Sequence, residues 1–181
     1  MTKAELRTVM KARTQEIGDA DWSEEDQESV YALTSSSWFQ DREWIFGFFP
    51  IKGEVDITPL LEAALQTKRL ALPRSNGDDT LTFYEVTDLA FLTKGRFGIR
   101  EPLGSTEVFP DEHAVIIVPA LAYSTTRQRL GRGRGYYDRY LGRYSDVLSI
   151  GVCRSYQLVE ELPTGKYDRT VDHLLCNGVW Y

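Results

Sequence analysis

Hydrophobic positions along this 181-residue chain recur with two periods, one typical of helices and one typical of strands. Near the start, Leu6, Val9 and Met10 fall on one helical face, and Thr2 and Glu5 have the spacing of a capping box. The pattern therefore predicts an N-terminal helix that opens at Thr2. Further helices are predicted over residues 23–38, 58–66 and 136–144.

Short apolar runs between these helices predict strands over residues 44–49, 69–72, 81–86, 114–118 and 147–152. Pro73 is expected to close the second of these strands. The run AVIIV at 114–118 is apolar on both faces, which is typical of a central parallel strand. Strands and helices alternate from about residue 44 onward, so the sequence predicts an α/β fold with a largely parallel sheet. No linker or internal repeat divides the chain, and we expect a single domain over residues 1–181.

The most informative stretch for function is RLGRGRGYYDRYL at residues 129–141. Its three glycines alternate with Arg132 and Arg134, and glycine lets backbone N–H groups approach a ligand closely. Arginine adds forked donors that suit phosphate or carboxylate, and a predicted helix follows whose N-terminus would face the same anion. This arrangement indicates an anion-binding loop.

Glycine spacing alone leaves two interpretations of this loop open. The spacing G-x-G-x-G is neither the dinucleotide fingerprint nor a Walker A loop, so a plain flexible loop and a phosphate cradle fit it about equally well. The arginines, the following helix and the acidic background of the chain favour anion binding. Asp138 also has two interpretations: a carboxylate stabilised by the helix dipole, or a ligand for a magnesium ion that arrives with phosphates.

Other candidate residues carry weaker signals. Tyr140 recurs at helical spacing and is expected to pack in the core, whereas Tyr136 adjoins the glycines and could line a site. Glu54 follows a predicted strand, which would place it at the carboxyl edge of the sheet, although a solvated turn is the simpler interpretation. The segment FGIREP at 97–102 could wall a pocket or fill one, and the pattern around Asp168 is typical of a surface loop.

Composition narrows the classes of function. The net charge of −6 and the isoelectric point of about 5.0 argue against a general nucleic-acid binder, whose affinity depends on a basic surface. Two isolated cysteines and two histidines far apart in the sequence indicate neither a disulfide framework nor a zinc site. The N-terminus lacks the apolar core of a signal peptide, and no apolar run is long enough to cross a membrane. We therefore expect a cytoplasmic protein.

Four segments, in order, match the 5-formyltetrahydrofolate cyclo-ligase family, also called 5,10-methenyltetrahydrofolate synthetase. They are KAELR at 3–7, GEVDITPLLEAALQTKRLALPR at 53–74, FGIREP at 97–102 and VPALAYSTTRQRLGRGRGYYDRYL at 118–141, and YDRTVD at 167–172 resembles the family's tail. The R-L-G-x-G-x-G-Y-Y-D core is highly specific, and the resemblance covers nearly the whole chain. It implies a three-layer α/β/α sandwich around a mostly parallel sheet, similar to that of some sugar-phosphate isomerases and CoA transferases.

The resemblance also implies an activity. Such enzymes use ATP and Mg²⁺ to convert 5-formyltetrahydrofolate to 5,10-methenyltetrahydrofolate, with release of ADP and phosphate. The formyl oxygen takes the γ-phosphate of ATP, N10 attacks the activated carbon, and loss of phosphate closes the ring. Such a reaction needs positioning and charge stabilisation more than a protein nucleophile, which suits a loop of glycines and arginines. The implied partner is the small-molecule substrate, with no nucleic acid or membrane partner, and the chain is expected to be a monomer.

Residue by residue, the resemblance assigns roles to the site. The implied ATP contacts are Lys3, Arg7, Arg129, Leu130, Gly131, Arg132, Gly133, Arg134, Gly135, Tyr136 and Tyr137. The implied substrate contacts are Phe49, Glu54, Phe97, Arg132, Gly133, Arg134, Gly135 and Tyr136. Asp138 and Asp168 resemble magnesium ligands, and the candidate catalytic residues are Arg132, Arg134 and Tyr136. Arg134 departs from the lysine of many members, which replaces a point donor with a fork and leaves the nucleotide geometry there open.

Three alternatives compete with this interpretation. A relative that binds nucleotide or folate without turnover is disfavoured by the intact loop, Glu54 and the two aspartates. A phosphosugar or CoA-ester enzyme on a similar sheet would need a catalytic carboxylate or lysine in another motif, and the sequence contains none. A nucleic-acid module built on the R-G-R-G run is disfavoured by the negative net charge.

Overall fold

The computed structural model describes residues 1–17, 20–104 and 106–181 of the chain. Its α-helices are α1 (Lys3–Ile17), α2 (Ser23–Ser35), α3 (Ser37–Gln40), α4 (Thr58–Thr67) and α5 (Tyr136–Arg143). Short 3-10 turns are η1 (Leu89–Phe91), η2 (Arg96–Gly98) and η3 (Ser155–Gln157). The strands are β1 (Trp44–Phe46), β2 (Arg69–Ser75), β3 (Leu81–Val86), β4 (Leu92–Lys94), β5 (Arg100–Pro102), β6 (Glu107–Val108), β7 (Ala114–Val118), β8 (Ala122–Ser124), β9 (Arg129–Leu130), β10 (Leu148–Cys153), β11 (Leu158–Val159), β12 (His173–Cys176) and β13 (Val179–Trp180).

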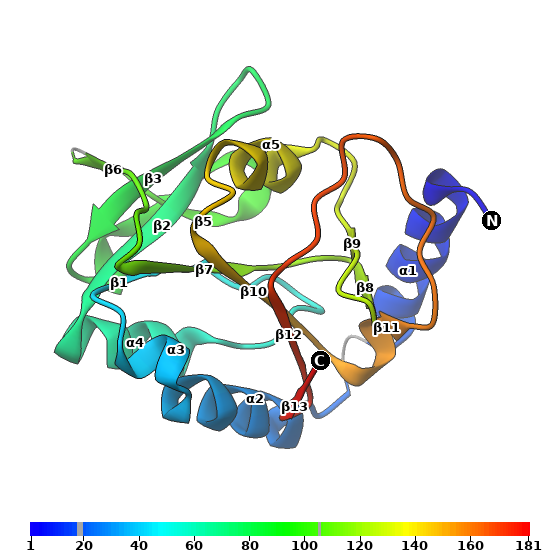
Figure 1. Cartoon of the computed structure of the whole chain (residues 1–181), viewed down its shortest axis with the longest axis horizontal. Coiled ribbons are helices and arrows are strands. Elements are labelled where there is room, and N and C mark those ends of the chain that lie inside the picture. Colours follow the sequence, from blue (N-terminus) through cyan, green and yellow to red (C-terminus); the bar gives the residue numbers. More distant parts are fainter. Residues whose placement is uncertain (18–19, 105) are drawn as a thin grey trace.

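The main sheet of the described residues has eight strands in the order β13-β12-β10-β7-β1-β2-β3-β6 (Figure 1). The inner strands from β12 to β2 pair in parallel, and β13, β3 and β6 add antiparallel pairings at the edges. β7 lies between β1 and β10 with every residue buried, which confirms the predicted central strand. The chain therefore has a mixed α/β fold with a mostly parallel sheet, as predicted.

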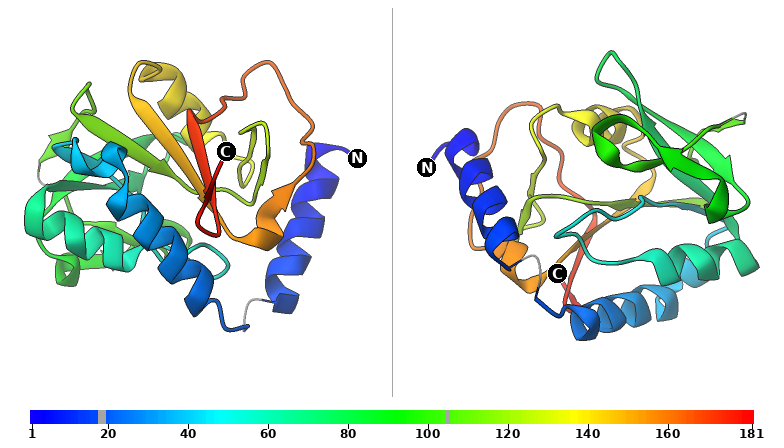
Figure 2. Two further views of the ribbon diagram at one scale, coloured as in Figure 1. Left: turned by 60° about the horizontal axis from the view of Figure 1, so that its bottom comes forward. Right: turned by 180° about the vertical axis from the view of Figure 1, so that it is seen from behind.

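Helices lie on both faces of this sheet (Figures 1 and 2). On one face α2, α3 and α4 pack through a core cluster that includes Leu33 of α2 and Leu61 of α4. On the other face α5 packs through Tyr140 and Leu141. α1 lies beside the small sheet of β11, β8 and β9, where Met10 is buried with residues of β8 and β9. The apolar stripes of the helices thus attach them to the sheet.

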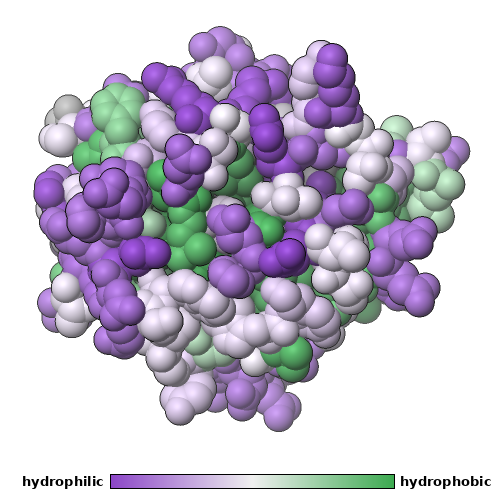
Figure 3. Space-filling model, in the orientation of Figure 1, coloured by the Kyte–Doolittle hydropathy of each residue, from purple (hydrophilic) through white to green (hydrophobic). Residues whose placement is uncertain are grey.

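The surface of the molecule is mainly polar. Figure 3 shows hydrophilic side chains over most of one face, with hydrophobic side chains visible in the hollow between them. Within the ranges that the structure describes, no helix combines the length and the apolar character needed to span a membrane.

The predicted helices form with one break. The capping box is present, because Thr2 N–H donates to Glu5 Oε2 at 2.7 Å and Glu5 N–H donates to Thr2 Oγ1 at 3.3 Å. The helix predicted over 23–38 is interrupted at Ser36, whose ψ of 149° is extended and whose Oγ accepts a hydrogen bond from Phe39 N–H. Serine side chains compete with helical backbone bonding in this way, so that α2 and α3 are separate helices.

The strands predicted over 81–86 and 114–118 form with those bounds, and the other three predicted strands have shifted ends. The strand predicted over 69–72 continues through Pro73 to Ser75. Proline is tolerated in this strand because β1 pairs only with residues 69–71, so no strand on that side needs the N–H group that Pro73 lacks. The strand predicted over 44–49 ends at Phe46, although Gly47 N–H still donates to the Ala71 carbonyl of β2 at 2.9 Å. The residues after Gly47 therefore follow the carboxyl end of β1.

Gly151 in β10 leaves space for Tyr123, a fully buried side chain of β8 whose hydroxyl donates to the Val118 carbonyl at 2.9 Å. A Cβ at position 151 would lie 2.6 Å from the Tyr123 ring. Overpacking of this kind destabilises a protein by about 1–3 kcal/mol. We predict that Gly151→Ala lowers the free energy of unfolding by about this amount in urea titrations. Gly77→Ala is the matched control because no atom lies within 4 Å of the added methyl group; equal stabilities of the two variants would contradict the prediction.

Candidate active site

The glycine loop, residues 131–135, connects β9 to α5 and adopts a path that requires glycine. Gly133 has a φ of +112° and Gly135 a φ of +68°, a region that side chains with a Cβ rarely adopt. Gly135 is also the N-cap of α5. The Arg7 side chain of α1 donates from Nε to the Gly131 carbonyl at 2.9 Å, so the N-terminal helix braces the start of the loop.

Two cavities lie against this loop, one of about 420 Å³ and one of about 180 Å³. Arg129, Gly131 and Gly135 line both of them. The loop is therefore a thin wall between a larger and a smaller binding space.

The smaller cavity is lined by charged side chains from three distant parts of the chain. The lining residues besides the shared three are Lys3, Arg7, Leu130, Gly133, Asp138 and Asp168. The charges are paired: Lys3 Nζ contacts Asp168 Oδ2, and Arg129 Nη2 lies 2.9 Å from Asp138 Oδ1. Cations and glycine amides of this kind suit a polyphosphate.

Arg129 is the most enclosed of these cations. Its side chain is 3% exposed, its guanidinium lies 5.6 Å from the centre of the Tyr137 ring, and its partner Asp138 lies in the first turn of α5. The buried Nε of Arg129 has no hydrogen-bond partner within the described ranges. A buried donor without a partner is costly, which makes this guanidinium a candidate to receive an anionic ligand.

The two aspartates are the acidic groups of the smaller cavity. Burial raises the pKa of Asp168, but hydrogen bonds from Lys3 and from Gly165 N–H outweigh burial, so its pKa lies below the ordinary value and the carboxylate stays charged. Asp138 also accepts a hydrogen bond from Arg169 N–H at 3.3 Å. In the part of the chain that the structure describes, no three acidic, histidine or cysteine side chains form a complete metal cluster. A cation held here would need further oxygen ligands from phosphate or water.

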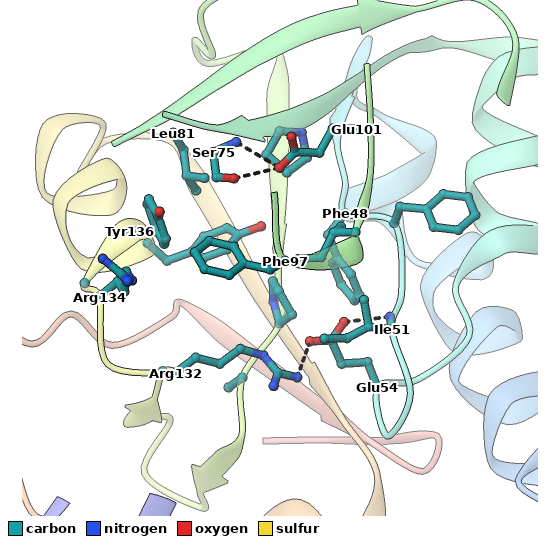
Figure 4. Close-up of a pocket in the computed structure, with 18 of the residues that line it drawn as sticks. Phe48, Ile51, Glu54, Ser75, Leu81, Phe97, Glu101, Arg132, Arg134 and Tyr136 are labelled. Carbon is teal, nitrogen blue, oxygen red and sulfur yellow. Dashed lines mark hydrogen bonds and ion pairs between the residues drawn. The ribbon is translucent and has the colours of Figure 1, made fainter. Parts of the chain in front are cut away.

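The larger cavity lies at the carboxyl ends of β1 and β7 and has largely apolar walls (Figure 4). Phe48 and Phe49 follow β1, Pro119 and Ala120 follow β7, and Phe97 comes from the turn between β4 and β5. Ligands commonly bind at this edge of a parallel sheet. Flat aromatic walls suit a ligand with planar rings.

Glu54 provides a buried carboxylate in this cavity. It is 8% exposed, its Oε1 lies 3.1 Å from Arg132 Nη2, and its Oε2 accepts a hydrogen bond from Ile51 N–H at 3.1 Å. Burial raises the pKa of Glu54 above its ordinary value, against the opposing effects of Arg132 and the Ile51 N–H. The solvated-turn interpretation of Glu54 is therefore wrong, because its side chain lies inside the cavity.

On the side of the larger cavity, the loop and the start of α5 carry further polar groups. Arg134 Nη1 lies 3.0 Å from Asp79 Oδ1, at the tip of the β2–β3 hairpin. The buried Tyr136 hydroxyl has no hydrogen-bond partner among the residues described. Burial raises the pKa of Tyr137, with a further rise from Glu54 and a reduction from Arg129, so the phenol stays protonated.

All residues that the sequence singled out for the site line one of these two cavities. Sequence reasoning missed several wall residues, which are Lys11, Phe48, Ile51, Pro73, Ser75, Leu81, Ile99, Arg100, Glu101, Pro119 and Ala120. The FGIREP segment was the available signal for Ile99, Arg100 and Glu101, although its pattern left open whether it walls a pocket or fills one.

Comparisons with known proteins identify the family of this chain. The model of the 5-formyltetrahydrofolate cyclo-ligase family matches residues 1–177. The chain belongs to this family. It is therefore a ligase of folate one-carbon metabolism, and the family generally uses ATP.

Individual relatives match over most of the chain. The 5-formyltetrahydrofolate cyclo-ligase of Mycolicibacterium smegmatis is 29% identical over 96% of this chain and 93% of its own length. That of Escherichia coli K12 is 34% identical over 67% of this chain and 70% of its own. The solution structure of Aquifex aeolicus 5,10-methenyltetrahydrofolate synthetase is 35% identical, covers 99% of this chain and 92% of that one, and has a TM-score of 0.85.

The buried carboxylate of Glu54 predicts a pH-dependent effect on stability. A raised folded-state pKa means that its contribution to stability is fully present below its ordinary pKa and is lost as the pH rises through the folded-state pKa. We predict that Glu54→Gln melts at a higher temperature than wild type at pH 7 and that the difference shrinks toward pH 4. Activity should fall roughly tenfold or more, as for loss of a charged hydrogen bond. Glu107→Gln, at an exposed position in β6, is the control. A difference in melting temperature between Glu54→Gln and wild type that does not depend on pH would contradict the raised pKa of Glu54.

Proposed function

We propose that this enzyme cyclises 5-formyltetrahydrofolate to 5,10-methenyltetrahydrofolate with consumption of ATP and release of ADP and phosphate. The observation that supports this most is the shared wall, since Arg129, Gly131 and Gly135 line both cavities. The smaller, charged cavity suits the phosphates of ATP, and the larger, aromatic cavity suits the rings of folate. A phosphoryl group could pass between them at the loop without entering solvent.

The position of the cavities on the scaffold supports this proposal. The larger cavity opens at the carboxyl ends of β1 and β7, and the glycine loop joins β9 to the N-terminus of α5. We further propose that the fold is a three-layer α/β/α sandwich similar to that of some sugar-phosphate isomerases and CoA transferases. The helices on both faces of the sheet support it (Figure 2).

The side chains of the smaller cavity fit ATP and Mg²⁺. Lys3, Arg7 and Arg129 would contact phosphate oxygens, together with the N–H groups of the glycine loop. Asp138 and Asp168 would hold Mg²⁺, which usually takes one or two protein carboxylates and completes its ligands with phosphate and water. The depressed pKa of Asp168 fits this role, because the ligand must be ionised. When bound, the ion would neutralise charge on the phosphates.

The walls of the larger cavity suit the folate substrate. Glu54 would accept hydrogen bonds from N–H donors of the pterin ring, while Phe49 and Phe97 would contact its faces. The unpartnered hydroxyl of Tyr136 would gain a partner from the substrate. The formyl oxygen would then take the γ-phosphoryl group, and N10 would close the ring as phosphate leaves.

The arginines of the loop would stabilise the charge that develops during phosphoryl transfer. Arg132 and Arg134 line the larger cavity, where their guanidinium groups are partly exposed and paired with Glu54 and Asp79. Hydrogen-bond donors that are already in place at the reacting group lower the barrier without reorganisation. Transfer of this kind requires no protein nucleophile.

A direct assay tests the proposed function. Protein is mixed with ATP, Mg²⁺ and 5-formyltetrahydrofolate, and the near-ultraviolet absorbance of the methenyl product is followed over time. We expect product that depends on both ATP and enzyme. Absence of ATP-dependent product absorbance with well-folded protein would contradict the proposed function.

The magnesium assignment is tested most cleanly at Asp168. Asp138 neutralises the buried Arg129, so its replacement would also affect folding, whereas Asp168 pairs with the partly exposed Lys3. We predict that Asp168→Asn raises the Mg²⁺ concentration for half-maximal activity roughly tenfold or more, the cost of one charged contact. Asp146→Asn, at an exposed position after α5, should leave this concentration unchanged. An unaltered magnesium requirement in Asp168→Asn would exclude the assignment.

The loop arginine Arg132 is expected to matter more than an arginine on the outer face of α5. We predict that Arg132→Ala lowers kcat/KM roughly 100-fold, the typical effect of removing one donor to the reacting group. Arg143→Ala should change it less than about twofold, because Arg143 is exposed and lines neither cavity. Melting curves of both variants control for stability, since Arg132 also pairs with Glu54. Equally small effects of the two substitutions on kcat/KM would contradict the proposed role of Arg132 in phosphoryl transfer.

A further inference from the structure

One wall of the larger cavity is a hairpin outside the main sheet. Strands β4 and β5 form a separate two-stranded ribbon, and its turn η2 carries Phe97 with a φ of +61° and Gly98 with a φ of +75°. Phe97, Ile99 and Glu101 of this hairpin line the cavity. The shape of the cavity therefore depends on how the hairpin is held.

Phe97 is not fixed by packing in the core. Its side chain is 57% exposed, and its ring contacts cations, with Arg96 at 5.3 Å and Arg134 of the glycine loop at 5.6 Å from its centre. The position of this ring follows from the anchoring of the hairpin as a whole. One anchor is at the surface, where Arg96 Nη1 donates to the Asn76 carbonyl at 2.9 Å.

The buried anchor of the hairpin is the carboxylate of Glu101. It is 6% exposed, and its Oε1 accepts hydrogen bonds from Ser75 N–H at 3.1 Å and from Ser75 Oγ at 2.7 Å (Figure 4). Ser75 is the last residue of β2, so these bonds tie the hairpin to the main sheet. Within the described ranges Glu54 and Glu101 are the buried acidic residues, and both line the larger cavity.

The turn of the hairpin is built around this carboxylate. A Cβ at Gly95 would lie 2.0 Å from Glu101 Oε2, so a side chain at this position would displace the carboxylate. Gly95 N–H in turn donates to the Ile99 carbonyl at 2.8 Å, which closes the turn beside Phe97. Burial of a carboxylate is costly, and an apolar side chain could seal the same position without this cost. The carboxylate therefore has a specific task, which is to accept both donors of Ser75.

We propose that Glu101 is a positioning residue for the folate substrate. Through Ser75 it fixes the β4–β5 hairpin, and with it Phe97, as a wall of the larger cavity next to Arg134. The inference rests on the proposed function, because the folate rings are what this wall would contact. Glu101 acts through Phe97, in contrast to Glu54, whose carboxylate would face the substrate directly.

Kinetics of two variants test this role. Glu101→Ala removes both hydrogen bonds and should raise the KM for 5-formyltetrahydrofolate roughly tenfold or more, because small displacements of a positioning group have large effects. The KM for ATP should stay within about twofold, since Glu101 does not line the smaller cavity. Glu101→Gln keeps an oxygen that accepts from Ser75 and should restore the KM for folate to within about threefold of wild type. Glu107→Ala, an exposed glutamate on β6, is the matched control.

A double-mutant cycle with Phe97 separates positioning from a general structural role. If Glu101 acts through the wall, Glu101→Ala should have little further effect on the KM for folate in a Phe97→Ala background. Additive effects of the two substitutions would overturn the proposal. A wild-type KM for folate in Glu101→Ala would do the same.

Hydrogen exchange gives a readout that needs no turnover. In Glu101→Ala the amides of residues 92–101 should exchange faster than in wild type, while those of central strand β7 should not change. If Glu101→Ala does not fold, Ser75→Ala removes one of the two donors and should show the same pattern with a smaller effect. Unchanged exchange in the hairpin would overturn the inference. Failure of wild-type protein to form product would instead count against the proposed function.

Discussion

The ion pair between Arg129 and Asp138 is the interaction on which the site depends most. A guanidinium that is 3% exposed is tolerated only with a partner, and Asp138 provides it at 2.9 Å. The pair joins β9 to the first turn of α5 and so fixes both ends of the glycine loop. It also restricts the loop sequence, since a Cβ at Gly131 would lie 2.8 Å from Arg129 Nη1. The burial of this one charge thus constrains the loop at both of its ends.

This local constraint is effective because the sheet holds its surroundings in place. The buried strand β7 ends at Val118 and is followed by Pro119 and Ala120, which line the larger cavity. The chain then enters β8, where Tyr123 packs over Gly151. Arg129 in β9 is paired with Tyr123 of β8 in the small sheet. The packing of Tyr123 therefore connects the main sheet to Arg129, which lines both cavities.

The sequence is sufficient to predict the regular helices and strands. It is not sufficient where a single side-chain contact determines the local structure. The period of apolar residues located α5 and β7, because burial along a whole helix face or strand produces a repeated signal. The break at Ser36 depends on one hydroxyl, and the buried state of Glu54 depends on Arg132, which is 78 residues away along the chain. Glu101 was missed for the same reason, since its partner Ser75 is distant in sequence. The local pattern of glycines and arginines locates the loop, and the family resemblance links it to Lys3, Glu54 and Asp168, whose roles local patterns leave open.

The charges around the glycine loop have a consequence for ligand binding. Each of four cations is paired with a carboxylate of the protein: Lys3 with Asp168, Arg129 with Asp138, Arg132 with Glu54 and Arg134 with Asp79. A bare polyphosphate would have to compete with these carboxylates, in a chain of net charge −6. ATP that arrives with Mg²⁺ would bring an anion for Lys3 and Arg129 and a cation for Asp168 and Asp138, so that neither member of these two pairs would be left without a partner. Under the proposed function, this exchange would favour the magnesium complex over free ATP.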